Sequence, residues 1–444
     1  MRHIRTKLGA LGLAVIAAVP LSLTAPEAAT AASGDTSAAT VEEKRLTQAA
    51  PQEILRRSGF ARWEREFARG LARVTTYPEA KRYVAREGRA LWRRAVDRAQ
   101  GRGPAEYEGR EAPAKGGGGR RAGLSRDDDR PLYWARLGMT RELREWQPGF
   151  TPSASQREAL VGLLERTSRG QDSIDLPAGK HVLRVVVTGF DPFQLDDDVR
   201  RSNPSGAAAL ALDGTTVRTA SGRPARIETA VFPVRWADFA EGTVERTLLP
   251  HVRRGARQVD LFTTVSQGRP GQFDLERTNG AWRGGSPDNA RESATGTVPI
   301  PDRVPTVHPQ PQWTTTTLPY ERIVAAGTGP YPVRDNTAVT EIPAGGTEPV
   351  ERPDGPTPGS TARAGGGGDY LSNEIAYRAT LLRDAVRPGL AGGHLHTPVL
   401  TFGPGNTDPA SGKVSDPVFV RNRVAITGQV RAIVTVAAGE VARG

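Results

Sequence analysis

Residues 182–193 read VLRVVVTGFDPF and combine a strand with the loop that follows it. The first six residues are apolar apart from Arg184, which is typical of a strand inside a sheet that is covered on both faces. In open α/β sheets, the loops at the carboxyl ends of central strands usually bind the ligand. We therefore expect Phe190 and Phe193, in this loop, either to pack into the core or to close on a flat, mostly apolar ring.

The chain after residue 178 alternates strand and helix patterns. A second apolar strand covers residues 259–265, and a helical pattern closes the chain at about residues 417–438. Strands that alternate with helices predict an α/β fold, here a three-layer α/β/α sandwich with a mainly parallel sheet. We expect this domain to span residues 179–444, with a Pro/Gly-rich insertion at residues 338–363. A loop of that length is usually functional or disordered.

Residues 1–31 have the pattern of a secretory signal peptide. A basic start precedes an apolar run over residues 8–23, and residues 29–31 read ATA, which is a small-residue cleavage site. The apolar run is short and contains Pro20, so we expect no stable membrane span once the signal is removed. We predict that the mature chain is secreted and begins near Ala32.

Residues 32–178 are predicted to form a helical, partly disordered N-terminal region. Aromatic and aliphatic residues recur at helical spacings between residues 54 and 96, and another helical pattern covers residues 155–169. A glycine run and high polarity predict a disordered or mobile break at residues 101–129. We expect the three aspartates at its end, residues 127–129, to form a solvated charge cluster rather than a metal site.

Composition limits the class of protein. The 444 residues are enough for two or three domains with a sizeable core. The net charge of +11 comes mostly from arginine, but the chain has no basic stripe interleaved with aromatic residues, so we expect no nucleic-acid binding. The chain has no cysteine, which excludes disulfides, a thiol nucleophile and thiolate metal ligands. We predict no cofactor and no metal, and composition leaves the oligomeric state open.

A glycine run changes abruptly into a helix at residues 365–377, which read GGGGDYLSNEIAY. Asp369 is a candidate helix N-cap, which places Ser372 in the first helical turn. Free backbone N–H groups and the positive end of the helix dipole gather there, so an oxyanion formed beside Ser372 would be stabilised. The alternative is that Ser372 is a plain helix-start residue, because serine is common at that position.

Several motifs follow one another in an order that is similar to that of a known family. They are TGFDPF at residues 188–193 with NPS at 203–205, AVFPV at 230–234, PDN at 287–289, TLP at 317–319, YLSN at 370–373 and AGGHLHTP at 391–398. Together they resemble the pyroglutamyl peptidase I family, the pyrrolidone carboxylate peptidases, over roughly residues 182–440. Those enzymes remove an N-terminal pyroglutamate from peptides with a Cys–His–Glu triad on an α/β/α sandwich.

The resemblance implies roles for particular residues of this chain. It implies Ser372 in the position of the cysteine nucleophile, His396 as the base, and Glu276 as the carboxylate that orients the imidazole. It also implies that the two loop phenylalanines line the pyroglutamate pocket, in a substrate-binding set of Phe190, Phe193, Gln267 and Arg283. The implied partner is a peptide with a blocked N-terminus.

Three departures from the family leave two functions open. Ser372 replaces a cysteine, and a hydroxyl is not readily ionised, so it must lose its proton during the attack. The spacing after Glu276 is shortened, and the insertion at residues 338–363 lies beside the nucleophile in sequence. One function is a secreted hydrolase with a Ser–His–Glu triad that acts on pyroglutamyl or related N-terminal groups. The other is a binding protein that keeps the pocket without turnover. The presence of His396 and Glu276 favours the enzyme.

Overall fold

The computed structural model describes residues 39–102 and 123–442, which belong to one compact unit of residues 36–444. The signal peptide predicted at residues 1–31 lies outside the described residues, as does most of the break predicted at residues 101–129. The described helices are α1 (Val41–Lys44), α2 (Ala49–Ser58), α3 (Arg62–Leu71), α4 (Tyr77–Ala99), α5 (Arg130–Glu145), α6 (Ala154–Thr167), α7 (Pro204–Leu212), α8 (Trp236–Ala240), α9 (Thr243–Val252), α10 (Tyr320–Ala325), α11 (Leu371–Val386) and α12 (Pro417–Val441), with short 3-10 helices η1 (Arg45–Thr47) and η3 (Pro404–Asn406).

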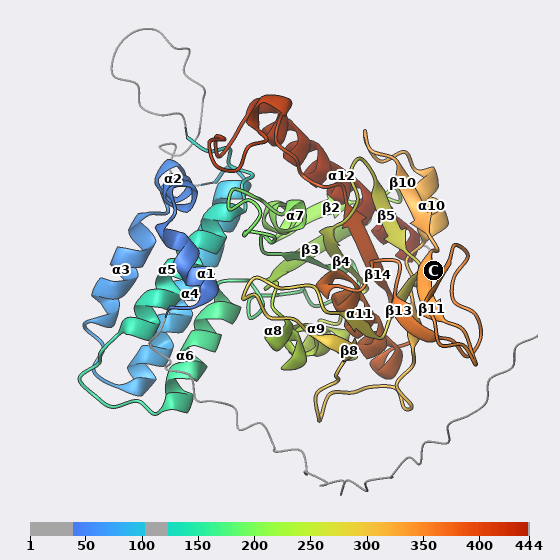
Figure 1. Ribbon diagram of the computed structural model, residues 1–444, viewed down its shortest axis with the longest axis horizontal. Helices are drawn as coiled ribbons and strands as arrows, with labels where there is room; N and C mark the ends of the chain where they lie inside the picture. The colour runs from blue at the N-terminus through green and yellow to red at the C-terminus, as the bar shows by residue number, and fades with distance from the viewer. Residues whose placement is uncertain (1–38, 103–122, 443–444) are drawn as a thin grey trace, which may run out of the picture. The chain divides into compact units, whose positions relative to one another are not determined.

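Seven strands form the central sheet, in the order β10-β5-β14-β4-β1-β3-β2 (Figure 1). The four inner strands β14, β4, β1 and β3 run parallel to one another, whereas β5 pairs antiparallel with β14 and β2 pairs antiparallel with β3. The prediction of a mainly parallel sheet is therefore confirmed. The seven strands are β1 (Leu183–Phe190), β2 (Thr215–Arg218), β3 (Pro224–Phe232), β4 (Leu261–Gln267), β5 (Phe273–Glu276), β10 (Val333–Asn336) and β14 (Ala391–Thr397).

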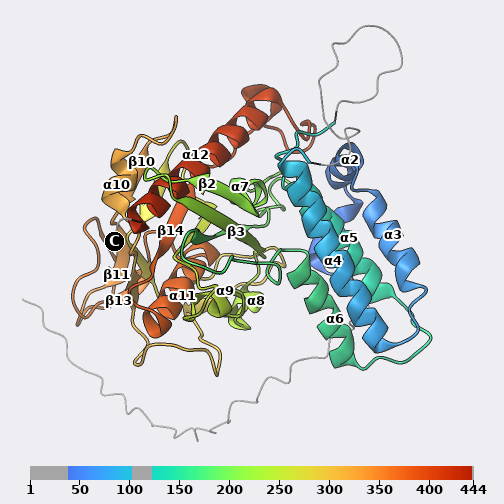
Figure 2. The same ribbon diagram turned by 180° about the vertical axis from the view of Figure 1, so that it is seen from behind.

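Helices cover both faces of this sheet (Figures 1 and 2). On one face, α7 and α12 share a hydrophobic core with Val185 and Val187 of β1. On the other face, α9 and α11 share a core with Val186 and Phe262. Side chains alternate along a strand, so neighbouring valines reach opposite helical layers. This is why β1 is apolar at almost every position, and it confirms the three-layer α/β/α sandwich.

Two helices of this sandwich begin at side-chain caps. Asn203 accepts a hydrogen bond from the N–H of Ser205 at the start of α7, and Asp416 accepts from the N–H groups of Val418 and Phe419 at the start of α12. By length and composition, α12 is the one helix in the described ranges that could cross a membrane. Its apolar side chains, including Phe419, pack instead in the core that it shares with the sheet.

Helices α1–α6 are packed as part of the same compact unit as the sheet domain. Their core contains Leu91, Trp92 and Trp134 from the helices, together with Leu210 of α7 and Val231 of β3. The central helix α5 is buried along most of its length. The N-terminal helical region is thus joined to the sheet domain through a shared apolar core.

The insertion at residues 338–363 forms an ordered antiparallel sheet, which we call the inserted sheet. Its strands are β11 (Val339–Ile342), β12 (Val350–Arg352) and β13 (Thr361–Ala364), in the order β12-β11-β13. Two further pairs, β6 (Thr278–Gly280) with β9 (Trp313–Thr315) and β7 (Trp282–Gly284) with β8 (Thr295–Thr297), complete the strands.

One buried carboxylate orders the inserted sheet. Glu341 accepts hydrogen bonds from Nε of Arg352 at 2.9 Å and from both the N–H and the hydroxyl of Thr357 at 2.6 Å. Burial alone would raise the pKa of Glu341, but these hydrogen bonds lower it to about 2. The carboxylate therefore stays ionised and holds together a segment that is rich in Pro and Gly.

The expectation of a solvated charge cluster at residues 127–129 is wrong for two of the three aspartates. Asp128 and Asp129 are only 2% and 4% exposed. Asp128 accepts a hydrogen bond from Nε of Arg130 at 2.8 Å and lies 3.5 Å from Nη1 of Arg423 in α12. Arg423 comes from an element that is distant in sequence, so local composition alone could not reveal the burial.

Asp128→Ala is expected to destabilise the fold by about 3–5 kcal/mol, because it leaves buried guanidinium groups without their carboxylate. Asp127→Ala is the matched control, since Asp127 is partly exposed and accepts a hydrogen bond from the hydroxyl of Ser125. We expect the control to change the free energy of unfolding by less than about 0.5 kcal/mol. Urea unfolding of both variants measures the difference, and equal losses would contradict the structural role of Asp128.

Candidate active site

Most of the sequence-predicted site residues lie at the carboxyl edge of the parallel strands. Phe190 ends β1, Gln267 ends β4, and His396 lies near the end of β14, in register with Ser266 of β4. Ser372 is the second residue of α11, in the first helical turn as predicted. Because the carboxyl ends of parallel strands meet at one edge of a sheet, the fold brings together segments that are far apart in the sequence.

His396 and Glu276 form a buried pair. Nδ1 of His396 lies 2.7 Å from Oε1 of Glu276, and the two residues are 5% and 1% exposed. An ionised carboxylate only accepts hydrogen bonds, so a neutral imidazole here carries its proton on Nδ1 and leaves Nε2 as an acceptor. Asn336 donates to Oε2 of Glu276 at 2.7 Å and fixes the other carboxylate oxygen. This arrangement fixes the orientation of the imidazole.

The hydroxyl of Ser372 has a different partner in this structure. Its Oγ donates to the backbone carbonyl of Gly367 at 3.0 Å. Gly367 lies close to the imidazole as well, since a Cβ built on it would be 3.0 Å from Cε1 of His396. The hydroxyl must therefore turn away from the Gly367 carbonyl before it can donate to the imidazole.

Residues 365–368 form an ordered turn beside the pair, which we call the glycine arch. The backbones of its first and last residues are hydrogen-bonded to each other, and the N–H of Gly366 donates to the carbonyl of Thr278 at 2.8 Å. A Cβ built on Gly366 would lie 2.2 Å from Oε2 of Glu276, which is too close for any side chain. Glycine is required here because the backbone passes directly beside a buried carboxylate.

The cap of α11 differs from the predicted one. The N-cap residue is Tyr370 rather than Asp369, and its side chain makes no capping hydrogen bond. The backbone carbonyl of Asp369 accepts instead from the N–H of Gly284 at 2.8 Å, which draws this residue toward β7. No side-chain oxygen of the N-cap residue thus occupies the first N–H groups of the helix, which are the groups that stabilise an oxyanion at such a position.

Ser372, His396 and Glu276 all line one cavity of about 710 Å³, together with Phe193 and Gln267. A small recess of about 40 Å³ shares Phe193, Gln267 and Ser372 with it and is also lined by Phe190. Phe190 is 3% exposed, and its ring stacks on Phe239 at a centroid distance of 6.0 Å. The two loop phenylalanines therefore belong to the core and to the cavity at once.

Arg283 lies elsewhere and is not among the described residues that line the cavity. Its guanidinium makes two hydrogen bonds of 2.6 Å to Glu374 of α11 and lies 5.2 Å from the ring of Trp236. Two other arginines line the cavity, Arg269 and Arg352. Arg269 follows the end of β4, and its Nε lies 3.9 Å from Asp274.

Sequence reasoning missed Asp274, Asn336 and the close approach of the glycine arch. Asp274 lies two residues before Glu276 on β5, lines the cavity and is in register with His396 across the sheet. Burial, and after it the nearby Glu276, raise the pKa of Asp274. Alternation along a strand puts both carboxylates on one face of β5, and this spacing was the available signal.

His394, the other histidine of β14, has a structural role. Its two ring nitrogens lie 2.7 Å from the hydroxyls of Thr264 and Ser266, and its ring meets that of His396 edge to face at 4.7 Å. Burial, and then the nearby His396, hold the pKa of His394 well below its usual range. A neutral, doubly hydrogen-bonded ring supports the neighbouring imidazole.

The helical region holds the loop that carries the two phenylalanines. Asp191, directly after Phe190, accepts from Arg136 of α5 at 2.6 Å and from Arg169 at 3.0 Å. Further along the loop, the backbone N–H of Asn203 donates to the carboxylate of Asp129, which lies directly before α5, at 3.0 Å. These side chains are all buried, so their hydrogen bonds are shielded from competing water.

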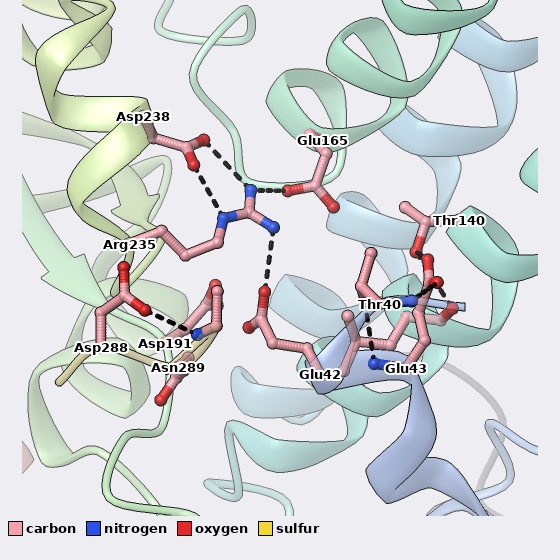
Figure 3. Close-up of polar contacts among 12 residues, drawn as sticks. Thr40, Glu42, Glu43, Thr140, Glu165, Asp191, Arg235, Asp238, Asp288 and Asn289 are labelled. Atoms are coloured by element: carbon pink, nitrogen blue, oxygen red, sulfur yellow. Dashed lines mark hydrogen bonds and ion pairs between the residues drawn. The ribbon is translucent and has the colours of Figure 1, made fainter. Parts of the chain in front are cut away.

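A second junction centres on Arg235, after β3 (Figure 3). Its guanidinium donates to Glu42 of α1 at 3.0 Å, to Glu165 of α6 at 2.5 Å and to Asp238 of α8 at 2.7 Å. Asp288, in the PDN motif, accepts from the backbone N–H of the residue after Arg235 at 2.8 Å. Carboxylates of the helical region therefore fix segments that border the site.

The fold and the site define an α/β/α protein with a buried histidine–glutamate pair at the carboxyl edge of its sheet. The chain belongs to the PA0049 family: residues 24–165 match the PA0049 N-terminal domain, and residues 184–310 and 332–401 match the PA0049 C-terminal domain. It is 35% identical over 486 aligned positions to "Uncharacterized protein PA0049" of Pseudomonas aeruginosa, an alignment that covers 88% of this chain and 85% of that protein.

Solved structures with some similarity are peptidases. A mutant pyrrolidone carboxyl peptidase from Pyrococcus furiosus is 22% identical and has a TM-score of 0.37, with 58% of this chain and 99% of that chain covered. Pyroglutamyl peptidase I of Bacillus amyloliquefaciens is 22% identical with a TM-score of 0.35, with 58% and 97% covered. Similarity at this level supports no conclusion about activity.

Gly366→Ala is expected to break the His396–Glu276 pair, because the new Cβ would lie 2.2 Å from Oε2 of the glutamate. A hydrogen-bonded Nδ1 proton should give a downfield proton NMR resonance in the wild type that disappears in the variant. Gly389→Ala is the matched control, since a Cβ there meets open space. An unchanged resonance in Gly366→Ala would show that the arch does not constrain the carboxylate.

Proposed function

We propose that this chain is a hydrolase that removes N-terminal pyroglutamate, or a similar blocking group, from peptides. The observation that carries the proposal is the buried His396–Glu276 pair on the wall of the cavity that Ser372 also lines. The ordered motifs that resemble the pyroglutamyl peptidase I family support the same reaction. Substrate, nucleophile and base would then meet in one cavity.

Ser372 is the nucleophile in this proposal. Its hydroxyl turns from the Gly367 carbonyl toward Nε2 of His396, which takes the proton as Oγ bonds to the carbonyl carbon of the pyroglutamyl group. N–H groups at the start of α11 stabilise the oxyanion. The imidazolium, held by Glu276, gives its proton to the leaving amine as the C–N bond breaks. Water, deprotonated by the same imidazole, then hydrolyses the ester and releases pyroglutamate.

In this proposal the lactam ring lies in the recess beside Ser372. The rings of Phe190 and Phe193 supply apolar contacts to its faces. Gln267 offers the polar contact: its Oε1 accepts from the N–H of Leu400 at 3.1 Å, which orients the amide and leaves the NH₂ group to donate to the lactam carbonyl. The recess would thus recognise an uncharged, cyclic amide.

The direct test is hydrolysis of a pyroglutamyl anilide by the purified mature protein. Ser372→Ala and His396→Ala should each lower kcat/KM by at least about 10³-fold, because each removes a member of a unit that acts together. Their melting temperatures should stay close to that of the wild type, which shows that the fold is intact. Full activity in Ser372→Ala would exclude this residue as the nucleophile.

A binding protein without turnover is the second candidate. The hydrogen bond from the Ser372 hydroxyl to the Gly367 carbonyl, rather than to His396, favours it. Free pyroglutamate would then raise the melting temperature, and the anilide would give no product.

Ser372→Cys separates the two candidates, because a thiol beside a histidine and a helix N-terminus ionises more readily than a hydroxyl. Activity in the variant with a silent wild type would show that pocket and base are intact and that only the nucleophile is lost. If wild type and variant are both inert, the hydrolase proposal is wrong.

We also propose that the protein is exported and that residues 1–31 are its signal peptide. The basic start, the apolar run and the ATA site support this. Protein purified from culture medium should begin near Ala32 on N-terminal sequencing. Medium protein that retains Met1 would contradict cleavage.

A further inference from the structure

The inserted sheet bounds the same cavity as the catalytic pair. Its lining includes Val339 and Thr340 of β11 and Arg352 of β12. The glycine arch, Ser372 and His396 line the same cavity. A volume of about 710 Å³ is in the range that encloses a drug-sized ligand, and the lactam ring takes up only a small part of it. The cavity therefore has room for the peptide that follows the pyroglutamyl group.

Arg352 is fixed at the wall of this space. Its Nε donates to Glu341 at 2.9 Å, and Glu341 is itself buried and held by Thr357. The two terminal nitrogens of Arg352 have no hydrogen-bond acceptor among residues 39–102 and 123–442. A guanidinium that is anchored through Nε and open at its other edge is prepared to bind a carboxylate with two parallel hydrogen bonds.

We propose that the inserted sheet forms a subsite for the C-terminal carboxylate of a short peptide, with Arg352 as the group that binds it. Arg269 lines the same cavity and adds a second positive charge there, because its ion pair with Asp274 is long, at 3.9 Å. Three carboxylates also line the cavity. Glu351 is exposed, so its charge is screened by solvent. Asp274 is hydrogen-bonded to Gln272, and Glu276 is hydrogen-bonded to His396 and Asn336. The proposal rests on the hydrolase function and makes it an enzyme for short pyroglutamyl peptides.

The test compares three substrates: one with a carboxylate at the chain end, one without a carboxylate, and one with a carboxylate on the side chain. The first is pyroglutamyl-alanine with a free C-terminus, and the second is its C-terminal amide. The third is the α-amide of pyroglutamyl-aspartic acid, which carries its carboxylate on the side chain. The wild type should prefer the free acid over the alanine amide by about tenfold in kcat/KM, mainly through KM, as a charged hydrogen-bonded contact predicts. Preference for the side-chain carboxylate instead would overturn the assignment to the chain end.

The variants remove or keep the charge of the subsite. Arg352→Gln should bring the acid-to-amide ratio close to one, and Arg352→Lys should restore part of it. Arg334→Gln is the matched control, because Arg334 is an exposed arginine on β10 outside the cavity lining, and it should keep the wild-type ratio. A wild-type ratio near one, or an unchanged ratio in Arg352→Gln, overturns the subsite.

Failure of the subsite and failure of the hydrolase proposal give different results. If the wild type cleaves the pyroglutamyl anilide but treats acid and amide alike, only the subsite is wrong. If the wild type cleaves nothing, the hydrolase proposal fails, and calorimetry of the same acid and amide decides the subsite. About tenfold tighter binding of the acid that Arg352→Gln removes supports the subsite, and equal affinities overturn it.

Discussion

The buried carboxylate of Glu276 is the constraint on which the site depends. An ionised group that leaves water must find hydrogen-bond donors, and His396 and Asn336 supply them, one to each oxygen. The chain that passes beside it has to be glycine, because any Cβ on Gly366 would collide with the carboxylate. The same turn sets the start of α11 and thereby the position of Ser372. The imidazole of His396, the carboxylate of Glu276 and the hydroxyl of Ser372 are thus positioned by one tightly packed junction.

The helical region gives the other wall of the site its rigidity. Loops at the carboxyl edge of a sheet are usually mobile, since few contacts hold them. Here Arg136 and Arg169 both bind the buried carboxylate of Asp191, and Asp129 accepts a hydrogen bond from the backbone N–H of Asn203. The loop that carries the phenylalanines is therefore clamped by charged side chains from α5 and its neighbours. The helical region thus acts on the site by holding a loop that borders it.

The inserted sheet shows how one ionised group can order a segment of unfavourable composition. Proline and glycine weaken both helices and strands, and this composition favours loops. Glu341 overcomes that tendency because its carboxylate gathers donors from β12 and from the following turn. The resulting sheet leads through β13 directly into the glycine arch. It can thereby shape the cavity without altering the His396–Glu276 pair.

The sequence by itself determined the α/β/α fold, because apolar strands such as residues 182–187 and the helices between them follow periodicities that local residues encode. It also predicted His396, Glu276 and Ser372 as site residues, through motifs whose order resembles that of a known family. Tertiary structure decided the rest. In the folded chain, Nδ1 of His396 contacts Glu276, and the Ser372 hydroxyl donates to the Gly367 carbonyl. Arg283 binds Glu374, and Asp128 is buried beside Arg130. His396 with Glu276, Arg283 with Glu374 and Asp128 with Arg423 are partners from distant segments. Such partners are brought together by folding and leave no periodic signal in the local sequence.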